Sequence, residues 1–352
     1  MPTRSRARGW ALVLAVTTAT SLGLELLGLP SPVLFGALLG GMAHALTSPT
    51  VLGVPVLAFR VGQGLVGVTI GALVSVDGLA RMGADVVPIL AVTLGTLGLS
   101  LAAGRALALR RDVSTVTGVF ALIAGGASGV VAVAHELGAD DRVVTVVQYL
   151  RVLMVLLAMP LVTALVFSPA HGVAELDGGG APWPTDAAYT LVALTVGLLL
   201  ARLVAVPTAT LLGPMAVAVA LGAGGWAGFD AASVPTLLQD LAYLLIGVQV
   251  GLRFTRASLA AITRMLPVVV ALITAVIALC AGLGALLTLT TGVDGLTAYL
   301  ATTPGGLFAV LATAADSGAD VTYVTAAQVF RLLVILLLTP PLASWLRRAP
   351  RD

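Results

Sequence analysis

Long stretches without a charged residue dominate this sequence and limit what it can fold into. Several of them reach or exceed the roughly 20 residues that a helix needs to cross the hydrocarbon core of a bilayer; they are 26–59, 152–174, 203–229, 265–293 and 295–315. These runs lack the alternating polar pattern of barrel strands, and backbone in lipid must satisfy its own hydrogen bonds. The chain is therefore predicted to be an all-α polytopic membrane protein.

Composition supports this class and excludes others. Hydrophobic residues make up 59% of the chain and the mean hydropathy is +1.09. Charged residues make up 10%, against about a quarter in soluble domains. The net charge of +2 comes from scattered arginines, which gives no reason to expect a nucleic-acid partner. Lys and Asn are both absent, which we interpret as GC-rich codon usage in a bacterium; the absence of Lys also excludes Schiff-base chemistry.

A second feature is an internal repeat at an offset of 180 residues. Residues 121–168 and 301–348 share the same order of motifs. The matching pairs are Gly125 and Gly305, Gly126 and Gly306, Gln148 and Gln328, Arg151 and Arg331, and Pro160 and Pro340. We therefore divide the chain into a first membrane repeat (1–167), an extracytoplasmic linker rich in Gly and Pro (168–186), and a second membrane repeat (187–352).

The hydrophobic pattern predicts six helical segments in each repeat. They are 10–29, 32–47, 56–75, 85–109, 115–137 and 142–167 in the first, and 187–206, 208–227, 235–253, 266–291, 296–315 and 321–346 in the second. If 115–137 and 296–315 are broken and return to the side they entered from, each repeat crosses the membrane five times. Every cluster of Arg and both termini then lie in the cytoplasm. This agrees with the excess of Arg that short cytoplasmic loops carry. An odd number of crossings makes the repeats inverted, an arrangement found in many secondary transporters.

The broken segments are the first candidate for a binding site. Thr302, Thr303, Pro304, Gly305 and Gly306 interrupt apolar sequence, and Gly125, Gly126 and Ser128 stand in the matching place. Pro removes a backbone donor and Gly permits unusual dihedral angles. Irregular backbone at membrane depth is tolerated where it lines a cavity or is buried in protein. The alternative interpretation is a helix kink or a packing notch of small residues.

Two arginines in apolar helices are the second candidate. Arg331 and Arg151 lie at equivalent positions, with Gln328 and Gln148 one helical turn earlier on the same face. A charged side chain at such depth is costly and is a candidate for binding a substrate. The structural alternative is an arginine that reaches the interface or pairs with Asp320, Asp140 or Asp141.

Other ionisable residues give weaker signals. Asp240 is a candidate for binding a coupling ion, although an interfacial residue at a helix start is the simpler interpretation. The three histidines are far apart and show no metal-ligand spacing, and Cys280 is the single cysteine. The sequence therefore predicts no metal site, no cofactor and no catalytic residues.

Several segments resemble the AbrB family of bacterial membrane proteins, which is built from the AbrB duplication domain. The resemblance rests on PSPVLFGALLGG, GQGLVGVTIG, LIGVQVGL, ATTPGGLFAV and QVFRLLVILLLTPPL, and covers nearly the whole chain. The family is labelled as a regulator of gene expression or as an ammonia monooxygenase, which implies a regulatory or an oxidising function. Here Ala124 stands where the second repeat has Pro304, so the two breaks differ.

These observations favour a non-enzymatic secondary transporter of a small anionic organic solute, coupled to an ion or proton gradient across the bacterial cytoplasmic membrane. The main alternative is a membrane regulator or sensor. It would need a soluble surface for partners, and the longest polar stretch is the linker 168–186. An oxidising enzyme would need metal ligands that the sequence hardly supplies. The partners expected are the solute and the bilayer, and a homodimer is left open.

Overall fold

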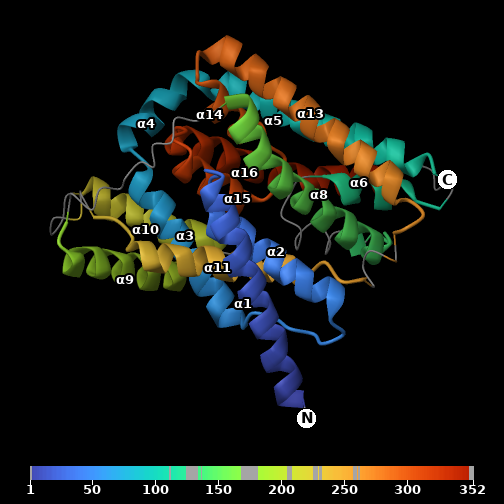
Figure 1. Ribbon diagram of the computed structural model, residues 1–352. Coiled ribbons are helices and arrows are strands. Elements are labelled where there is room, and N and C mark those ends of the chain that lie inside the picture. Colours follow the sequence, from blue (N-terminus) through green and yellow to red (C-terminus); the bar gives the residue numbers. More distant parts are fainter. Residues whose placement is uncertain are drawn as a thin grey trace. The chain divides into compact units, whose positions relative to one another are not determined.

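The structure of the chain is a computed structural model in which residues 2–110, 112–123, 134–135, 137–167, 181–203, 208–224, 229, 232–256, 260 and 262–348 are described. The described residues form helices joined by turns and loops, without strands. Figure 1 shows the helices with the labels used below. The all-α prediction is confirmed for this part of the chain.

The helices fall close to the predicted segments. In the first half they are α1 (Pro2–Leu26), α2 (Pro32–Thr47), α3 (Val56–Leu73), α4 (Val76–Arg81), η1 (Met82–Asp85), α5 (Val86–Ala108), α6 (Thr115–Leu122), α8 (Asp141–Val162) and the π-helical turn η2 (Thr163–Phe167). In the second half they are α9 (Trp183–Leu200), α10 (Ala209–Ala223), α11 (Thr236–Gly251), α13 (Leu266–Thr291), α14 (Gly295–Thr302), α15 (Leu307–Asp316) and α16 (Val321–Arg348). The short α4 was not predicted, and α1 begins eight residues earlier than expected.

Six helical segments are long and apolar enough to cross a membrane. They are Ser5–Leu26, Val56–Leu73, Val86–Ala108, Asp141–Phe167, Trp183–Leu200 and Leu266–Thr291. Shorter apolar helices of 10–17 residues include α2, α10, α11 and α15. At a rise of 1.5 Å per residue, a 16-residue helix measures about 24 Å, somewhat less than the ~30 Å hydrocarbon core.

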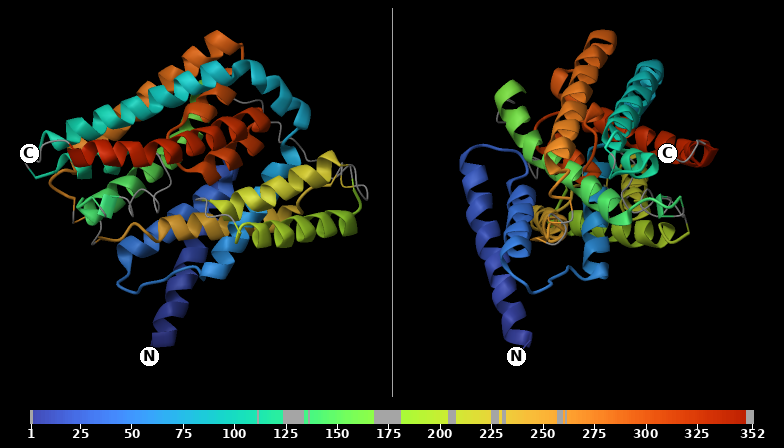
Figure 2. Two further views of the ribbon diagram at one scale, coloured as in Figure 1. Left: turned by 180° about the vertical axis from the view of Figure 1, so that it is seen from behind. Right: turned by 90° about the vertical axis from the view of Figure 1, so that its right-hand side faces the viewer.

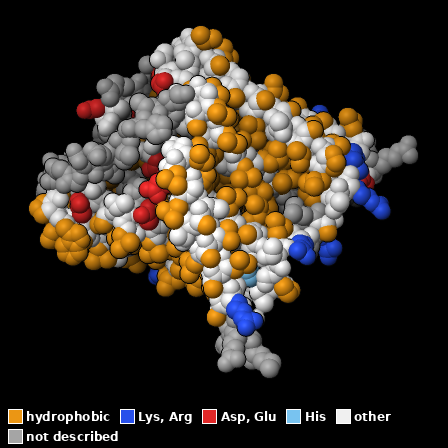
Figure 3. All heavy atoms as spheres, in the orientation of Figure 1, with side chains coloured by type: hydrophobic (Ala, Val, Ile, Leu, Met, Phe, Trp, Pro, Cys, Tyr) orange, Lys and Arg blue, Asp and Glu red, His pale blue; other side chains and the backbone are white. Residues whose placement is uncertain are grey.

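The outer faces of these helices carry large apolar side chains. Leu22 on α1, Leu191 on α9 and Leu289 on α13 are 55%, 62% and 83% exposed. Hydrophobic side chains cover much of the face drawn in Figure 3. Such surface suits lipid rather than water, which agrees with a membrane protein.

The chain folds into two compact units, each of which takes helices from both halves of the sequence. Unit 1 comprises Met1–Ala80, Pro160–Arg256 and Leu311–Thr322. Unit 2 comprises Arg81–Met159, Ala257–Val310 and Tyr323–Asp352. The predicted repeats 1–167 and 187–352 are thus divisions of the sequence, and the packed units cut across them.

Unit 1 is built by an exchange of helices between the halves. α3 packs on α10, and α11 packs on α2. A Cβ added to Gly67 would clash with the Leu211 carbonyl oxygen, and one added to Gly247 would clash with the Leu34 carbonyl oxygen. Glycine therefore permits both close approaches, and these two contacts occupy matching positions of the repeat.

Unit 2 packs the short helices α6 and α14 against two long ones. α5 packs on α6 and α13, and α13 packs on α14. Figure 2 shows α5 and α13 side by side from behind, in cyan and orange. Val119 and Phe120 of α6 lie in one apolar core with Val144 of α8. Ala298 and Ala301 of α14 lie in another. Unit 2 thus holds the described members of both predicted sets, namely Thr302–Gly306 and the Gln–Arg pairs Gln148/Arg151 and Gln328/Arg331.

Candidate functional site

The site in unit 2 begins with two short half-helices that have side-chain caps at matching positions. The Ser114 hydroxyl accepts a hydrogen bond from the Thr117 backbone N–H at 3.2 Å, at the start of α6. Asp294, 180 residues later, accepts from the backbone N–H groups of Leu296 and Thr297 at 3.0 and 3.2 Å. Such caps satisfy N–H groups that a helix leaves unpaired at its start.

The second half-helix ends where the sequence predicted a break. α14 stops at Thr302, and α15 starts at Leu307. Between them Gly305 has φ 144° and Gly306 has φ 69°, values that favour glycine. The predicted interruption at Pro304–Gly306 is therefore confirmed.

Gln148 and Arg151 of α8 close the C-terminal end of α6. The Gln148 amide donates to the Phe120 and Ile123 carbonyl oxygens at 2.7 and 2.9 Å. Arg151 donates through Nη1 to the Leu122 carbonyl at 3.0 Å and through Nη2 to Gln148 Oε1 at 2.9 Å. These carbonyl groups would otherwise lack partners at a helix end.

Gln328 and Arg331 of α16 do the same for α14. The Gln328 amide donates to the Leu300 carbonyl at 2.7 Å, with longer contacts to Ala301 and Thr303. Arg331 donates through Nη1 to the Thr303 carbonyl at 2.6 Å and through Nη2 to Gln328 Oε1 at 2.5 Å. The two sets of bonds are near-copies at the 180-residue offset.

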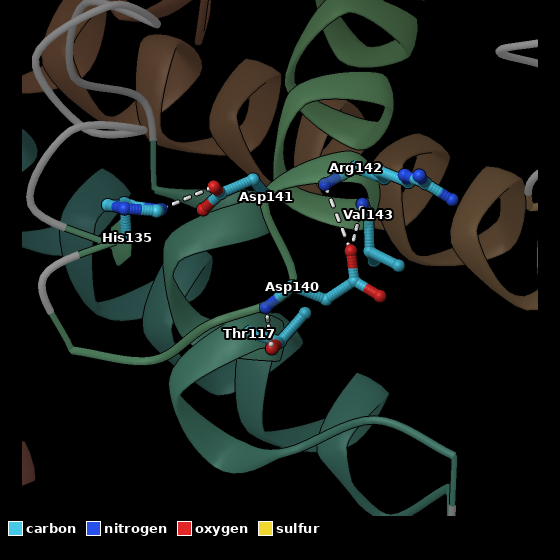
Figure 4. A network of polar contacts seen from close by, with 6 residues as sticks. All are labelled: Thr117, His135, Asp140, Asp141, Arg142 and Val143. Atoms are coloured by element: carbon cyan, nitrogen blue, oxygen red, sulfur yellow. Dashed lines mark hydrogen bonds and ion pairs between the residues drawn. The ribbon is translucent and has the colours of Figure 1, made fainter.

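The two arginines therefore have a structural role other than the alternatives predicted from the sequence, which were reaching the interface or pairing with an aspartate. They cap half-helices, and neither reaches Asp140 or Asp141. Asp140 instead accepts from the Arg142 and Val143 backbone N–H groups at the start of α8, and Asp141 contacts His135 at 2.6 Å, as Figure 4 shows.

Capping leaves part of the positive charge in unit 2 uncompensated. Both arginines are buried, with 3% and 7% exposure, and within the described residues neither is joined to a carboxylate. A helix C-terminus offsets about half a unit charge, so each cap leaves roughly half a positive charge. The charge of Arg331 also acts unfavourably on Arg151.

One donor of this pair is free and faces the break. Arg151 Nε is buried without a hydrogen-bond partner among the described residues. A Cβ added to Gly305 would lie 3.5 Å from it. The N-terminus of α15 follows this turn and adds a partial positive charge. A buried N–H donor, net positive charge and a helix N-terminus together can accept a small anion.

The other predicted residues of the broken segments either bond to the backbone or lie outside the described part of the chain. The Thr302 and Thr303 hydroxyls are buried and donate to backbone carbonyl oxygens of α14, including Tyr299 at 3.1 and 2.7 Å. Gly125, Gly126 and Ser128 lie outside the described residues. The structure thus brings Arg151 of the first repeat to Gly305 of the second.

Asp240 lies in unit 1, on α11, where its charge interacts with that of Glu25. A residue that sequence reasoning missed is Asp316, the last residue of α15, which accepts a hydrogen bond from Ser31 at 2.6 Å. The available signal was its place at the end of the half-helix that starts at the break. No group of three or more metal-binding side chains occurs in the described part of the chain.

Comparisons with known proteins agree on one family. The family described as "Transition state regulatory protein AbrB" matches residues 33–347. The chain is 32% identical over 338 residues to "Putative regulator AbrB" of Escherichia coli (strain K12), covering 96% of each chain. It is 25% identical over 350 residues to "Uncharacterized protein YhjN" of Bacillus subtilis (strain 168), covering 93% of this chain and 90% of that one.

Proposed function

The chain belongs to the AbrB family, and from that premise we propose that it is a secondary transporter of a small anionic organic solute. The solute would cross the bacterial cytoplasmic membrane together with an ion or proton. No metal or cofactor is part of this proposal, and the protein would not act as an enzyme.

The observation that carries the proposal is the unpaired Nε of Arg151 beside the turn at Gly305. A buried donor of a charged group without an acceptor is costly. A carboxylate at this turn would accept from Arg151 Nε and from backbone N–H groups at the start of α15. It would also neutralise the charge that the two helix ends leave uncompensated.

The repeated pattern of caps supports a transport cycle. Two half-helices with matching N-caps and matching Gln–Arg closures are what two related segments of an internal repeat would present, and internal repeats are common in secondary transporters. We propose five crossings and one broken segment in each repeat, with both termini in the cytoplasm and the linker 168–186 outside.

The test is uptake into vesicles that contain the purified protein. A panel of radiolabelled carboxylates and amino acids is compared with matched cations and neutral sugars, for the wild type and the Arg151→Lys variant. A hydrogen bond to a charged group contributes about 1.5–3 kcal/mol, so Arg151→Lys should weaken affinity by about 10- to 150-fold. Uptake of no anion by the wild type would refute the proposal.

A matched control lies on the same helix. Arg142 is exposed at the start of α8, so Arg142→Lys should transport normally. Thermal unfolding of each variant in detergent separates loss of binding from loss of folding. Equal affinities of the wild type and a folded Arg151→Lys protein would show that this arginine binds no substrate.

A regulatory function is the alternative, because the family is described as regulatory and its Escherichia coli relative is named a putative regulator. It requires a surface that a partner can reach outside the membrane. The linker 168–186 is the longest polar stretch for this purpose. Deletion of most of this linker should leave uptake intact if the protein is a transporter.

A further inference from the structure

We propose that the Asp316 carboxyl in unit 1 is the proton-binding site of the transporter, so that the coupling ion is H⁺. This inference rests on the proposed function, because it names the ion that drives that transport. It starts from the contact between the end of α15 and the start of α2.

Asp316 lies between two helix ends that act on it in opposite ways. It is the last residue of α15, where the helix dipole disfavours a negative charge. Its Oδ2 accepts from the Ser31 hydroxyl at 2.6 Å, and Ser31 is the N-cap of α2, whose dipole favours a negative charge. The ionised carboxylate therefore holds the two helix ends together, and protonation weakens that contact.

The groups that face Asp316 supply no positive charge. They are the Asp240 carboxylate and the Tyr243 phenol of α11 and the Ser31 hydroxyl of α2. Asp240 in turn interacts with Glu25 of α1. Neighbouring carboxylates without a cation favour retention of a proton on one of them. Neither Arg nor His is among these neighbours in the described part of unit 1.

Independent evidence comes from a buried hydroxyl on the same helix. Thr313 lies one turn before Asp316, on the same face of α15. Its Oγ1 is fully buried and has no hydrogen-bond partner among the described residues. Such a group is satisfied by a bound water, which would lie one helical turn from the carboxyl.

Two further carboxylates accompany Asp316 in unit 1. Glu25 is exposed, whereas Asp240 and Asp316 are half-buried.

α15 connects this carboxyl to the anion site. The Gly305–Gly306 turn precedes its first residue and Asp316 is its last, so one ten-residue helix begins at the turn and ends at the carboxyl. One proton taken up at Asp316 balances one negative charge accepted at the turn. The carboxylate gains an O–H bond on loading and loses it on release.

Infrared titration of the full-length protein in vesicles of phosphatidylethanolamine and phosphatidylglycerol tests the site without a substrate. The wild type should lose a protonated-carboxyl band as pH is raised. Asp316→Asn should lack that component, and Asp112→Asn, at an exposed loop position, should retain it. A band unchanged in Asp316→Asn would overturn the proposal.

Two further variants give shifts of opposite sign. Ser31→Ala removes a donor to the ionised form and should raise the titration midpoint by about one pH unit. Asp240→Asn removes a like charge and should lower it. Shifts in the same direction, or no shift, would contradict the assignment even if Asp316→Asn failed to fold.

A transport measurement separates this inference from the proposed function. For an anion taken up by the wild type, Asp316→Asn should still exchange it across the membrane. The variant should not accumulate it in response to a pH gradient. Gradient-driven accumulation by Asp316→Asn would refute the proton site alone, whereas a wild type without any uptake would refute the transporter. Accumulation driven by Na⁺ instead of H⁺ would also refute the proton site.

Discussion

Gly305 has an unusual backbone conformation and lies beside the candidate anion site. Its φ of 144° is rarely adopted by other residues, and an added Cβ would lie against Arg151 Nε. We expect Gly305→Ala to lower the free energy of unfolding by about 1–3 kcal/mol and to weaken anion binding. Thermal unfolding in detergent and uptake in vesicles measure the two effects.

Gly282 provides the matched control for this substitution. It lies within α13, and an added Cβ would meet nothing within 4 Å. Gly282→Ala should therefore stabilise the helix by about 0.5–1 kcal/mol. A neutral effect of Gly305→Ala on both stability and uptake would show that the turn is neither strained nor part of the site.

The Arg110–Asp112 pair shows which charges are unimportant for stability. The side-chain hydrogen bond from Arg110, at 3.0 Å, lowers the pKa of the Asp112 carboxyl. A lowered pKa in the folded state contributes stability above the unfolded pKa, and this contribution is lost as pH falls through the folded pKa. Because the pair is exposed to solvent, we expect Arg110→Ala to leave the unfolding midpoint unchanged in titrations across the acid range. A clear loss of stability near neutral pH would contradict this.

At the scale of the helices, two glycine contacts hold unit 1 together. An Ala at Gly67 or at Gly247 would press its Cβ on a backbone carbonyl of the facing helix. Backbone cannot yield as a side chain can, so each substitution should cost about 1–3 kcal/mol or more. Thermal unfolding should show similar losses for both, since the contacts occupy matching positions. Gly23→Ala on α1, with open space around it, should have little effect; unequal losses at 67 and 247 would argue against equivalent packing.

The helices were predictable from local pattern, and their partners were not. Uncharged runs bounded by Arg, Asp and Gly predicted the segments, and Pro304–Gly306 predicted the break, because both depend on residues adjacent in sequence. The backbone acceptors of Gln148 and Arg151 lie 25–29 residues away in sequence, so sequence alone identified the donors without their role. The role of Asp316 was not predicted, because nothing local shows that Ser31, 285 positions earlier, contacts it.

At the scale of the whole molecule, the repeat and the packed unit are different divisions. Sequence similarity at an offset of 180 predicts two consecutive halves. The observed units each combine α-helices of both halves, because small residues at matching positions allow α3 to pack on α10 and α11 on α2. Such an exchange leaves no local signal. In each case a helix of one half packs on a helix of the other half that matches its own neighbour in sequence.

The remaining prediction concerns how the chain crosses the membrane. Cys280 is the single cysteine and is fully buried, so Cys280→Ser gives a cysteine-free background. Single cysteines are then placed by Ser5→Cys, Ser168→Cys and Ala349→Cys. With five crossings per repeat, an impermeant maleimide should label position 168 on intact spheroplasts. Positions 5 and 349 should be labelled only after permeabilisation, in keeping with the excess of Arg near both termini.

If each broken segment crossed fully, each repeat would cross six times, and position 168 would be protected until permeabilisation like the termini. The two repeats would then be parallel, and the half-helices α6 and α14 would belong to continuous crossings instead of two segments that enter from opposite sides.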